Sequence, residues 1–344
     1  MLKAYHERGF MNNLKDRVTI YQVAQAANVS LATVSRVINK KGNVTEETRK
    51  RVEKTIAELG YKPSALAQAL ATSKSTTIGI IIPTPNYVYI SNLLTGLTEV
   101  AKDLGFIVTL FTTSRSRDET LNTIERVITS HVDGAIIFDD ELDYRDIETI
   151  NSYHVPTIVI NSRMTGEQAG SLAFNYDNII IELIDKFYQA DSKGVTPTFL
   201  HVHNGGRLVS KCEKAFIDYH TSKNLPYHIV NCDDSYLRTY ADFKEYFKTH
   251  KDGMFFCNRD SIAAAILNAA TESGLDIPND VQVLSIVGGK YAHIVKPYLS
   301  AVYINMKDVG KRAMYMLDEL IKGQLTQKTY TFEGKYEKRD STRF

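Results

Sequence analysis

The chain has 344 residues, enough for two or three domains, and 43% of them are apolar, which is ample for a packed core. Its net charge is only +1, yet residues 1–62 carry twelve Lys or Arg against six Asp or Glu, and the remainder is acidic, which indicates nucleic-acid binding at one end. The lack of an 18-residue apolar run, of a signal region and of paired cysteine spacings argues against a membrane span and secretion, so we expect a cytoplasmic protein.

Residues 1–17 show no hydrophobic periodicity and are expected to form a disordered extension. Two interpretations of residues 1–10 stand side by side, a disordered extension and an upstream choice of translation start. A regular helical spacing of apolar residues begins only at Val18.

The stretch from Val18 to Asn39 has the spacing of two short amphipathic helices. Thr19 and Ser30 are candidate N-caps for them, and Asn28 between them suits a left-handed turn. The second helix is predicted to bury Val34, Val37 and Ile38. Its outward face then consists of Leu31, Ala32, Ser35, Arg36 and Asn39. This pattern predicts a helix-turn-helix whose second helix enters the major groove, with a helical hairpin of some other α-domain as the alternative.

These residues resemble the LacI/GalR family of bacterial repressors, whose pattern runs roughly V-T-I-x-D-V-A-x-x-A-G-V-S-x-x-T-V-S-R-V-x-N. The sequence departs from this pattern at Gln22, where the family usually has Asp, and at Asn28, where it usually has Gly. Asn can adopt the same turn conformation as Gly. Gln replaces a possible capping carboxylate and is therefore expected to weaken the cap. The resemblance implies a homodimer that binds a pseudo-palindromic operator in double-stranded DNA.

The resemblance also implies two sets of DNA contacts. Leu31, Ala32 and Arg36 match the base-contacting positions, and the Arg36 guanidinium suits O6 and N7 of guanine. The residues expected to contact phosphates and set the register are Thr19, Tyr21, Ser30, Thr33, Ser35, Asn39 and Thr48.

A loop and a third helix follow the second helix. Thr45 is expected to cap the third helix and Gly60 to end it. Its buried stripe is predicted to consist of Val52, Ile56 and Leu59. The helix-turn-helix domain is therefore expected over residues 18–63.

Residues 64–76 are expected to form a hinge helix and a linker. The resemblance implies that Ala67 belongs to a small-residue face on which two hinge helices meet, and that Leu70 wedges between bases at the operator centre. A helix of this length is marginal alone, so we expect it to order only on DNA.

From Thr77 onward, short apolar runs alternate with segments of helical period. The strands are predicted at residues 78–82, 107–111, 134–138, 157–160, 198–203, 227–232, 253–257 and 281–286. Helices between them predict an α/β core with parallel sheets and helices on both faces. The resemblance implies a periplasmic-binding-protein-like core for effector binding and dimerisation over residues 77–344. Its lobes are expected at about 77–175 with 304–333, and about 176–303 with 334–344, with an effector bound at the strand ends between them.

The family's effector pocket is matched only in part. Its strand-end Asp corresponds to Asp260, but its frequent sugar-binding Arg is replaced by Cys212 and its G-F/Y-D-D loop by residues 285–289. Sugars are usually held by bidentate Arg and Asp contacts, so we expect no tight binding of unmodified mono- or disaccharides. The remaining effector candidates are Asn161, Arg163 and Asp260.

Within the family, regulators of the catabolite-control type resemble residues 18–110 more closely. Such regulators take a serine-phosphorylated HPr phosphocarrier as corepressor. Their R-P-x-L-T-x-V segment is matched by residues 296–302, in which Lys296 keeps the charge of the Arg but loses its planar fork. Lys296 thus joins the effector candidates, and a sugar, a phosphorylated metabolite and a phosphoprotein all stay open as effectors.

No motif for an enzyme, a cofactor or a metal site is present, since His201 and His203 lack a third ligand. The sequence thus predicts a homodimeric regulator that represses carbohydrate-related genes under control of an effector or corepressor. One alternative is a solute-binding or sugar-processing protein on the same core, and the basic head argues against it. The other is an effector-independent regulator with a degenerate pocket.

Overall fold

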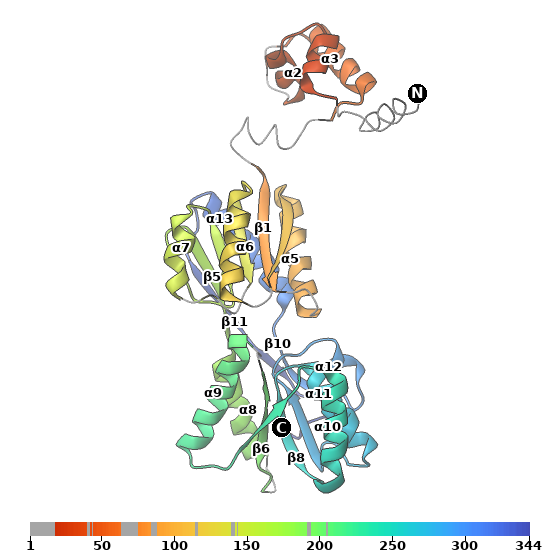
Figure 1. Cartoon of the computed structure of the whole chain (residues 1–344), viewed down its shortest axis with the longest axis vertical. Helices are drawn as coiled ribbons and strands as arrows, with labels where there is room; N and C mark the ends of the chain where they lie inside the picture. The colour runs from red at the N-terminus through yellow and green to blue at the C-terminus, as the bar shows by residue number, and fades with distance from the viewer. Residues whose placement is uncertain are drawn as a thin grey trace, which may run out of the picture. The chain divides into compact units, whose positions relative to one another are not determined.

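The computed structural model describes residues 18–39, 42, 44–62, 75–83, 88–113, 116–138, 142, 144–190, 194–203 and 206–344. The chain forms two compact units, Met1–Ser75 with a three-helix head and Thr76–Phe344 with a two-lobed core (Figure 1). No helix among these described residues is long and apolar enough to cross a membrane. The predicted N-terminal extension and most of the predicted hinge, with Ala67 and Leu70, lie outside the described residues.

Three helices form the described part of the head, namely α1 (Ile20–Ala26), α2 (Leu31–Ile38) and α3 (Glu46–Leu59). Their small core consists of Val23, Ala24, Ala27, Val34, Val37 and Val52. These side chains are short, so three short helices can pack closely around them. The predicted helix-turn-helix head is confirmed.

Each helix of the head begins at a hydroxyl side chain. Ser30 and Thr45 each accept a hydrogen bond from the backbone N–H three residues on, at 3.2 and 3.4 Å. Thr19 does the same for Gln22, and the Gln22 Oε1 accepts from the Thr19 backbone N–H at 2.7 Å, which completes a capping box. The expectation that Gln22 weakens this cap is wrong, because its amide oxygen accepts the bond that a carboxylate would accept.

The turns of the head adopt the predicted left-handed conformations, with φ of +52° at Asn28 and +64° at Gly60. The buried stripe of α3 differs from the prediction. Leu59 is 38% exposed, because the small core ends before the last turn of the helix. Thr55 is buried instead, and its hydroxyl stays satisfied by donating to the Arg51 carbonyl at 2.9 Å.

The first lobe of the core is a six-stranded sheet in the order β11-β5-β4-β3-β1-β2. Its strands are β1 (Thr77–Pro83), β2 (Ile107–Thr113), β3 (Gly134–Phe138), β4 (Thr157–Ile160), β5 (Ala169–Asn175) and β11 (Thr329–Glu333). One face is covered by α5 (Val88–Leu104) and α13 (Met306–Ile321). The other is covered by α6 (Arg117–Thr129) and α7 (Ile147–Ser152), which follows a 3-10 turn at Tyr144–Asp146. Burial on both faces explains why β1 reads as a continuous apolar run.

The second lobe has the same architecture, with the sheet order β12-β10-β9-β8-β6-β7. Its strands are β6 (Pro197–Val202), β7 (His228–Cys232), β8 (Gly253–Cys257), β9 (Val281–Ser285), β10 (Ser300–Tyr303) and β12 (Lys335–Glu337). One face is covered by α8 (Tyr176–Gln189) and α9 (Gly206–Ser222), the other by α10 (Tyr236–Thr249) and α11 (Asp260–Glu272). A short helix, α12 (Tyr291–Ile294), lies between β9 and β10.

The chain passes between the two sheets after β5, after β10 and after β11 (Figure 1). The two-lobed α/β class is confirmed, but the prediction of purely parallel sheets is wrong at one edge. β12 pairs antiparallel with β10, because it enters the second sheet directly from the first lobe whereas β10 leaves toward it. The predicted helix between residues 157–160 and 198–203 is present as α8, but the prediction lacks β5, which follows β4 through residues 161–168 and pairs with it in parallel.

Candidate DNA-binding face and effector loops

The outward face of α2 begins at its first turn. Leu31, Ala32 and Arg36, the predicted base-reading residues, are all exposed, while Val34 and Val37 anchor the opposite face in the core. Residues 31 and 32 occupy the first turn and residue 36 lies about one turn later. The helix therefore presents two apolar side chains and one guanidinium on a single surface.

Most of the predicted phosphate-contacting residues lie at the N-termini of the head helices, whereas Ser35 and Asn39 lie toward the C-terminus of α2. Tyr21 is 68% exposed in the first turn of α1, which Thr19 caps. Ser30 Oγ and Thr33 Oγ1 lie 2.9 Å apart at the start of α2. The side-chain amide of Asn39 donates to the Ser35 carbonyl at 2.9 Å and to its hydroxyl at 3.2 Å, while Thr48 Oγ1 accepts from Thr45 at 2.9 Å. Hydroxyls and N–H groups at helix N-termini suit phosphate oxygens.

Two effector candidates lie in the loop that follows β4 in the first lobe. Asn161 comes directly after the strand with a left-handed φ of +65° and is half-buried. Arg163 is exposed. Both follow the carboxyl end of a parallel strand, which is where ligands bind in sheets of this kind.

The third effector candidate, Asp260, is the first residue of α11 and is buried. Its Oδ2 accepts the backbone N–H groups of Tyr291 at 2.8 Å and Ala292 at 3.3 Å. Burial raises the pKa of the Asp260 carboxyl, and the backbone N–H groups oppose this rise. The Asp260 carboxylate is therefore engaged by the protein itself, through Oδ2, at the start of α12.

The loop after β9 explains why the family's paired carboxylates are missing here. A Cβ at Gly288 would lie 2.6 Å from the ring of Tyr303, and one at Gly289 would lie 2.9 Å from Asp260 Oδ2. Burial raises the pKa of Tyr303 to about 12, so its hydroxyl stays protonated. Acidic side chains at positions 288 and 289 would require Tyr303 or Asp260 to move.

The fourth candidate, Lys296, is exposed between α12 and β10. Its Nζ lies 3.2 Å from the centre of the Tyr298 ring, a cation–π contact. Lys296 and Asp260 belong to the second lobe and Asn161 and Arg163 to the first, so the four candidates are divided between the two lobes.

Sequence reasoning missed Asn258, which follows β8 at its carboxyl end. Asn258 is only 4% exposed, and its Oδ1 accepts no hydrogen bond from the described residues. A buried amide oxygen without a donor is costly unless a ligand or water supplies one. The signal available in the sequence was its place directly after an apolar strand and two residues before Asp260.

Cys212, which stands where the family often has arginine, is fully buried in the second lobe. It packs with Phe199 and Phe216 in the core beneath α8 and α9. A buried thiol in this position offers an effector neither charge nor a donor fork.

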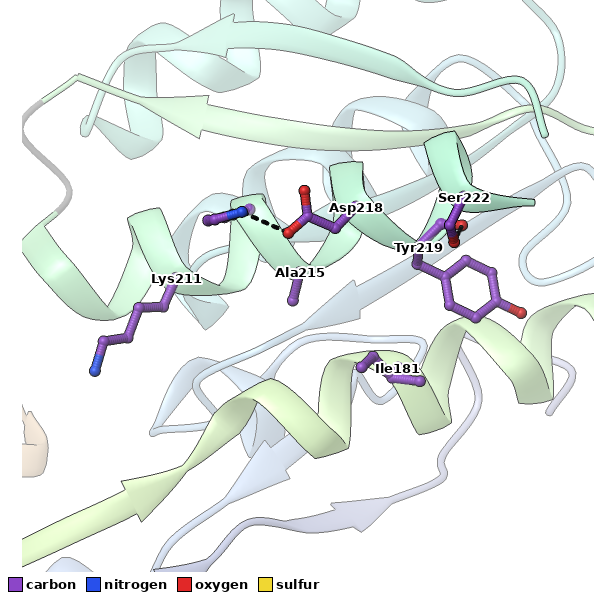
Figure 2. A pocket seen from close by; sticks show the side chains of 7 residues that line it. Ile181, Lys211, Ala215, Asp218, Tyr219 and Ser222 are labelled. Carbon is purple, nitrogen blue, oxygen red and sulfur yellow. Dashed lines mark hydrogen bonds and ion pairs between the residues drawn. The ribbon is translucent and has the colours of Figure 1, made fainter. Parts of the chain in front are cut away.

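A cavity of about 530 Å³ lies between α8 and α9 in the second lobe (Figure 2). Its lining consists of Ile181, Lys211, Lys214, Ala215, Asp218, Tyr219 and Ser222. Lys214 and Asp218 form an ion pair at 2.6 Å on its rim. The α9 residues that line it come from the middle and end of the helix, away from the strand ends that carry the effector candidates.

Two family models match parts of the chain. Residues 19–64 match bacterial regulatory proteins of the lacI family, and residues 198–342 match the periplasmic binding protein-like domain. The first match covers the helix-turn-helix head, and the second covers most of the second lobe.

Full-length relatives match both units together. Catabolite control protein A of Staphylococcus epidermidis is 30% identical over 317 residues, which cover 88% of this chain and 94% of the relative. The protein of the same name from Priestia megaterium is 29% identical over 330 residues, which cover 92% and 98%.

Solved structures show the same fold. The lac repressor dimer bound to operator and the anti-inducer ONPF has a TM-score of 0.80 at 23% identity, with 95% of this chain and 99% of that chain covered. The complex of the regulator CelR with cellobiose has a TM-score of 0.63 at 21% identity, with 94% and 100% covered. From these matches, and above all from the full-length relative at 30% identity, the chain belongs to the lacI family of bacterial regulatory proteins and is a DNA-binding transcription regulator.

Proposed function

We propose that this protein is a cytoplasmic repressor of carbohydrate-related genes that binds a pseudo-palindromic operator as a homodimer and responds to an effector. The observation that carries the proposal is the outward face of α2, where Leu31, Ala32 and Arg36 are exposed over a packed three-helix core. Relatives that match along most of the chain include catabolite control proteins, and this supports the carbohydrate assignment.

In this function, α2 lies in the major groove and its outward face reads bases. Arg36 donates a pair of hydrogen bonds to O6 and N7 of a guanine, and Leu31 and Ala32 contact base edges through apolar atoms. The helix N-termini and hydroxyls around Thr19, Tyr21, Ser30, Thr33, Ser35, Asn39 and Thr48 hold phosphates and fix the register.

Replacing Arg36 tests the base-reading role. Arg36→Ala should lose roughly 1–3 kcal/mol of discrimination at one operator position, measured by binding to a panel of single-base variants. Lys54→Ala removes the same charge from α3, where Lys54 pairs with Glu58 at 3.7 Å, and should leave base preference unchanged. An unaltered preference profile for Arg36→Ala would remove this residue from the reading set.

The hinge is proposed to order only when two heads sit on DNA. Small residues such as Ala67 would let two hinge helices meet, and Leu70 would enter a central base step at a cost of a few kcal/mol, returned by wider contact with a bent site. Leu70→Ala should therefore weaken specific binding and DNA bending while salt-sensitive non-specific binding changes little. A gel-shift bending assay in which Leu70→Ala matches the parent would reduce the hinge to a tether.

Exposed apolar side chains on both lobes support the homodimer. In the second lobe, Leu237 is 76% exposed and Ile294 is 56% exposed. In the first lobe, Ile107 and Leu110 are exposed on β2, the edge strand of its sheet. An edge strand with exposed apolar side chains needs cover, and a second copy of the chain can supply it.

The effector is proposed to be something other than a free sugar. Cys212, Gly288 and Gly289 remove the charged groups that would grip one, while Asn161, Arg163 and Asn258 remain at the strand ends. Calorimetry with lactose and cellobiose should show no tight binding. Micromolar binding of either sugar that is lost in Asn161→Ala would overturn this part of the proposal.

A phosphorylated protein is the second candidate effector, and Lys296 favours it. Lys296 is exposed beside Tyr298, and a flexible ammonium there can bind a phosphoryl group as a point charge. Binding of serine-phosphorylated HPr should weaken as salt rises and should be lost in Lys296→Ala. Equal binding of the unphosphorylated carrier would exclude this role.

A further inference from the structure

Many hydroxyl side chains inside the helices of this protein give their proton to a carbonyl of the same helix. In the head, the buried Thr55 hydroxyl donates to the Arg51 carbonyl, four residues back, at 2.9 Å. A hydroxyl bonded in this way has no proton left for a ligand. The same bond to the carbonyl four residues back is made in the core by Thr95, Thr98, Thr271 and Ser273.

Ser35, on the predicted outward face of α2, is bonded the other way round. The side-chain amide of Asn39 donates to Ser35 Oγ at 3.2 Å and to the Ser35 carbonyl at 2.9 Å. A carbonyl only accepts hydrogen bonds, so the Asn39 atom that faces Ser35 must be the amide nitrogen. Ser35 Oγ is therefore an acceptor in this pair, and no described residue accepts its proton.

Thr48, in the first turn of α3, has the same bond direction. Thr45 Oγ1 accepts the Thr48 backbone N–H at 3.4 Å and donates its own proton to Thr48 Oγ1 at 2.9 Å. The Thr48 hydroxyl thus accepts a bond from Thr45, and within the described part of the chain nothing accepts the Thr48 proton. Two hydroxyls on two different helices of the head therefore keep their protons available.

These available protons suit an anionic acceptor. A hydroxyl that already accepts one hydrogen bond is a stronger donor, because hydrogen bonds in a chain polarise one another. Residues 18–62 carry eight Lys or Arg against four Asp or Glu, so the head also attracts an anion by its charge. Asn39 itself is poorly suited to a phosphate, since both of its amide protons go to Ser35 and only its oxygen is left.

We propose that Asn39 and Thr45 are positioning residues that turn the hydroxyl protons of Ser35 and Thr48 toward phosphate oxygens of the DNA. Asn39 thus acts through Ser35 in place of a phosphate contact of its own, and Thr45 acts through Thr48 in the same way. The proposal rests on the DNA contacts proposed above and deepens them, because it assigns which side chain of each pair donates to the phosphate.

A double-mutant cycle on DNA binding tests this assignment in the full-length protein. The probes are an operator that the parent selects from random duplexes and an unrelated duplex of the same length. Ser35→Ala should weaken binding about tenfold, because it loses a bond to a charged group. Asn39→Ala should weaken binding about fivefold in the parent but no more than about twofold in Ser35→Ala, because the hydroxyl through which Asn39 acts is already gone.

The pair on α3 adds a rescue by a conservative variant. Thr45→Val removes the hydroxyl and should weaken binding about fivefold, whereas Thr45→Ser keeps the hydroxyl and should bind like the parent. Thr55→Val is the matched control, because its hydroxyl donates into its own helix. Thr55→Val should lower the stability of the head without changing DNA affinity.

Base preference provides the second measurement. Phosphates carry no sequence information, so Ser35→Ala should weaken binding to all single-base variants of the operator equally. A changed preference would mean that Ser35 contacts a base, and equal effects of Asn39→Ala in the parent and in Ser35→Ala would mean that Asn39 does not act through Ser35. Either result would overturn the proposal. A parent that selects no operator would instead contradict the repressor proposed above, while the cycle on the unrelated duplex would still decide the role of Asn39.

Discussion

Side chains cap the N-termini of α1, α2 and α3 in the head and of α12 in the second lobe. The capping residue directly precedes the helix in the head, whereas the residue that caps α12 lies far from it along the chain. In the head, Thr19, Ser30 and Thr45 each cap the helix that they immediately precede. In the second lobe, α12 is capped by Asp260, more than thirty residues before it. The C-terminal segment Asp340–Phe344 likewise bonds to β9 and to the start of β10.

Because these contacts differ in their distance along the chain, the two regions should respond differently to a change elsewhere in the protein. The helices of the head pack around a small core, and their ends are fixed by neighbouring residues. The DNA-contacting face of α2 should therefore be unaffected by changes elsewhere in the chain. The loops of the second lobe depend on contacts between distant segments, and moving one segment displaces another. The head is therefore suited to reading DNA in one fixed conformation, and the second lobe to sensing.

Among the substitutions that test this comparison, the largest effect on stability is expected when Ser341 is replaced. This fully buried serine donates to the Val283 carbonyl at 2.6 Å and accepts the Ser300 backbone N–H at 2.8 Å. Ser341→Ala leaves both backbone groups without this partner and should lower the free energy of unfolding of the core by about 2 kcal/mol, measured by urea denaturation.

Ser222→Ala provides the comparison within the same lobe. Its hydroxyl donates to the Tyr219 carbonyl only three residues away, on an exposed helix end. Its loss should cost no more than about 0.5 kcal/mol. Equal effects of the two substitutions would mean that distant hydroxyl bonds do not hold the second lobe together.

A smaller effect is expected for the local cap at Ser30. Ser30→Ala removes the acceptor for the Thr33 backbone N–H and should destabilise the head by about 1 kcal/mol, whereas Ser30→Gly should cost only a few tenths. Hydrogen exchange should rise in α1, α2 and α3 and stay unchanged in the core. A change that reached the core amides would break the contrast between the two regions.

The local nature of the head explains why its structure could be predicted. Capping by Thr19, Ser30 and Thr45 depends on residues three positions apart, and the left-handed turn at Asn28 depends on one residue. The exposure of Leu59 was not predicted, because the spacing of apolar residues indicates which face of a helix is buried but not where a small core ends. The same limit applies to the strands, whose apolar runs were visible while β5, β10, β11 and β12 were not predicted.

The effector region could not be predicted to the same degree, because its contacts join distant segments. The position of Asp260 was visible from its motif, but its use by Tyr291 and Ala292 depends on how α11 and α12 pack. The antiparallel direction of the edge strand β12 was not predicted for a similar reason, since it depends on where the chain re-enters the second lobe. Asn258 carried no pattern beyond its place after a strand.

The smallest expected effect concerns pH and also lies in the second lobe. His220 is fully buried among the rings of Phe216, Tyr219, Tyr227 and Tyr188. Its Nδ1 donates to the Phe216 carbonyl at 2.7 Å, and its Nε2 has no hydrogen-bond partner among the described residues. Burial lowers the pKa of His220 from its ordinary 6.5, and the bond to Phe216 only partly opposes this shift.

The sign of the pH effect follows from this lowered pKa. At a pH between 6.5 and the lowered pKa of the folded lobe, the folded lobe binds fewer protons than the unfolded chain. The contribution of neutral His220 is therefore present above pH 6.5 and is lost as the pH falls from 6.5 through the folded pKa. His220→Phe keeps a ring among the surrounding rings and removes the titration. Urea denaturation at about pH 7.5 and about pH 5.5 should show a smaller loss of stability on acidification in this variant than in the parent. His228→Gln, at an exposed position on β7, should lose as much as the parent. If His220→Phe also loses as much as the parent, the buried imidazole does not contribute to the acid sensitivity of the second lobe, and the weak point must be sought among its carboxylates.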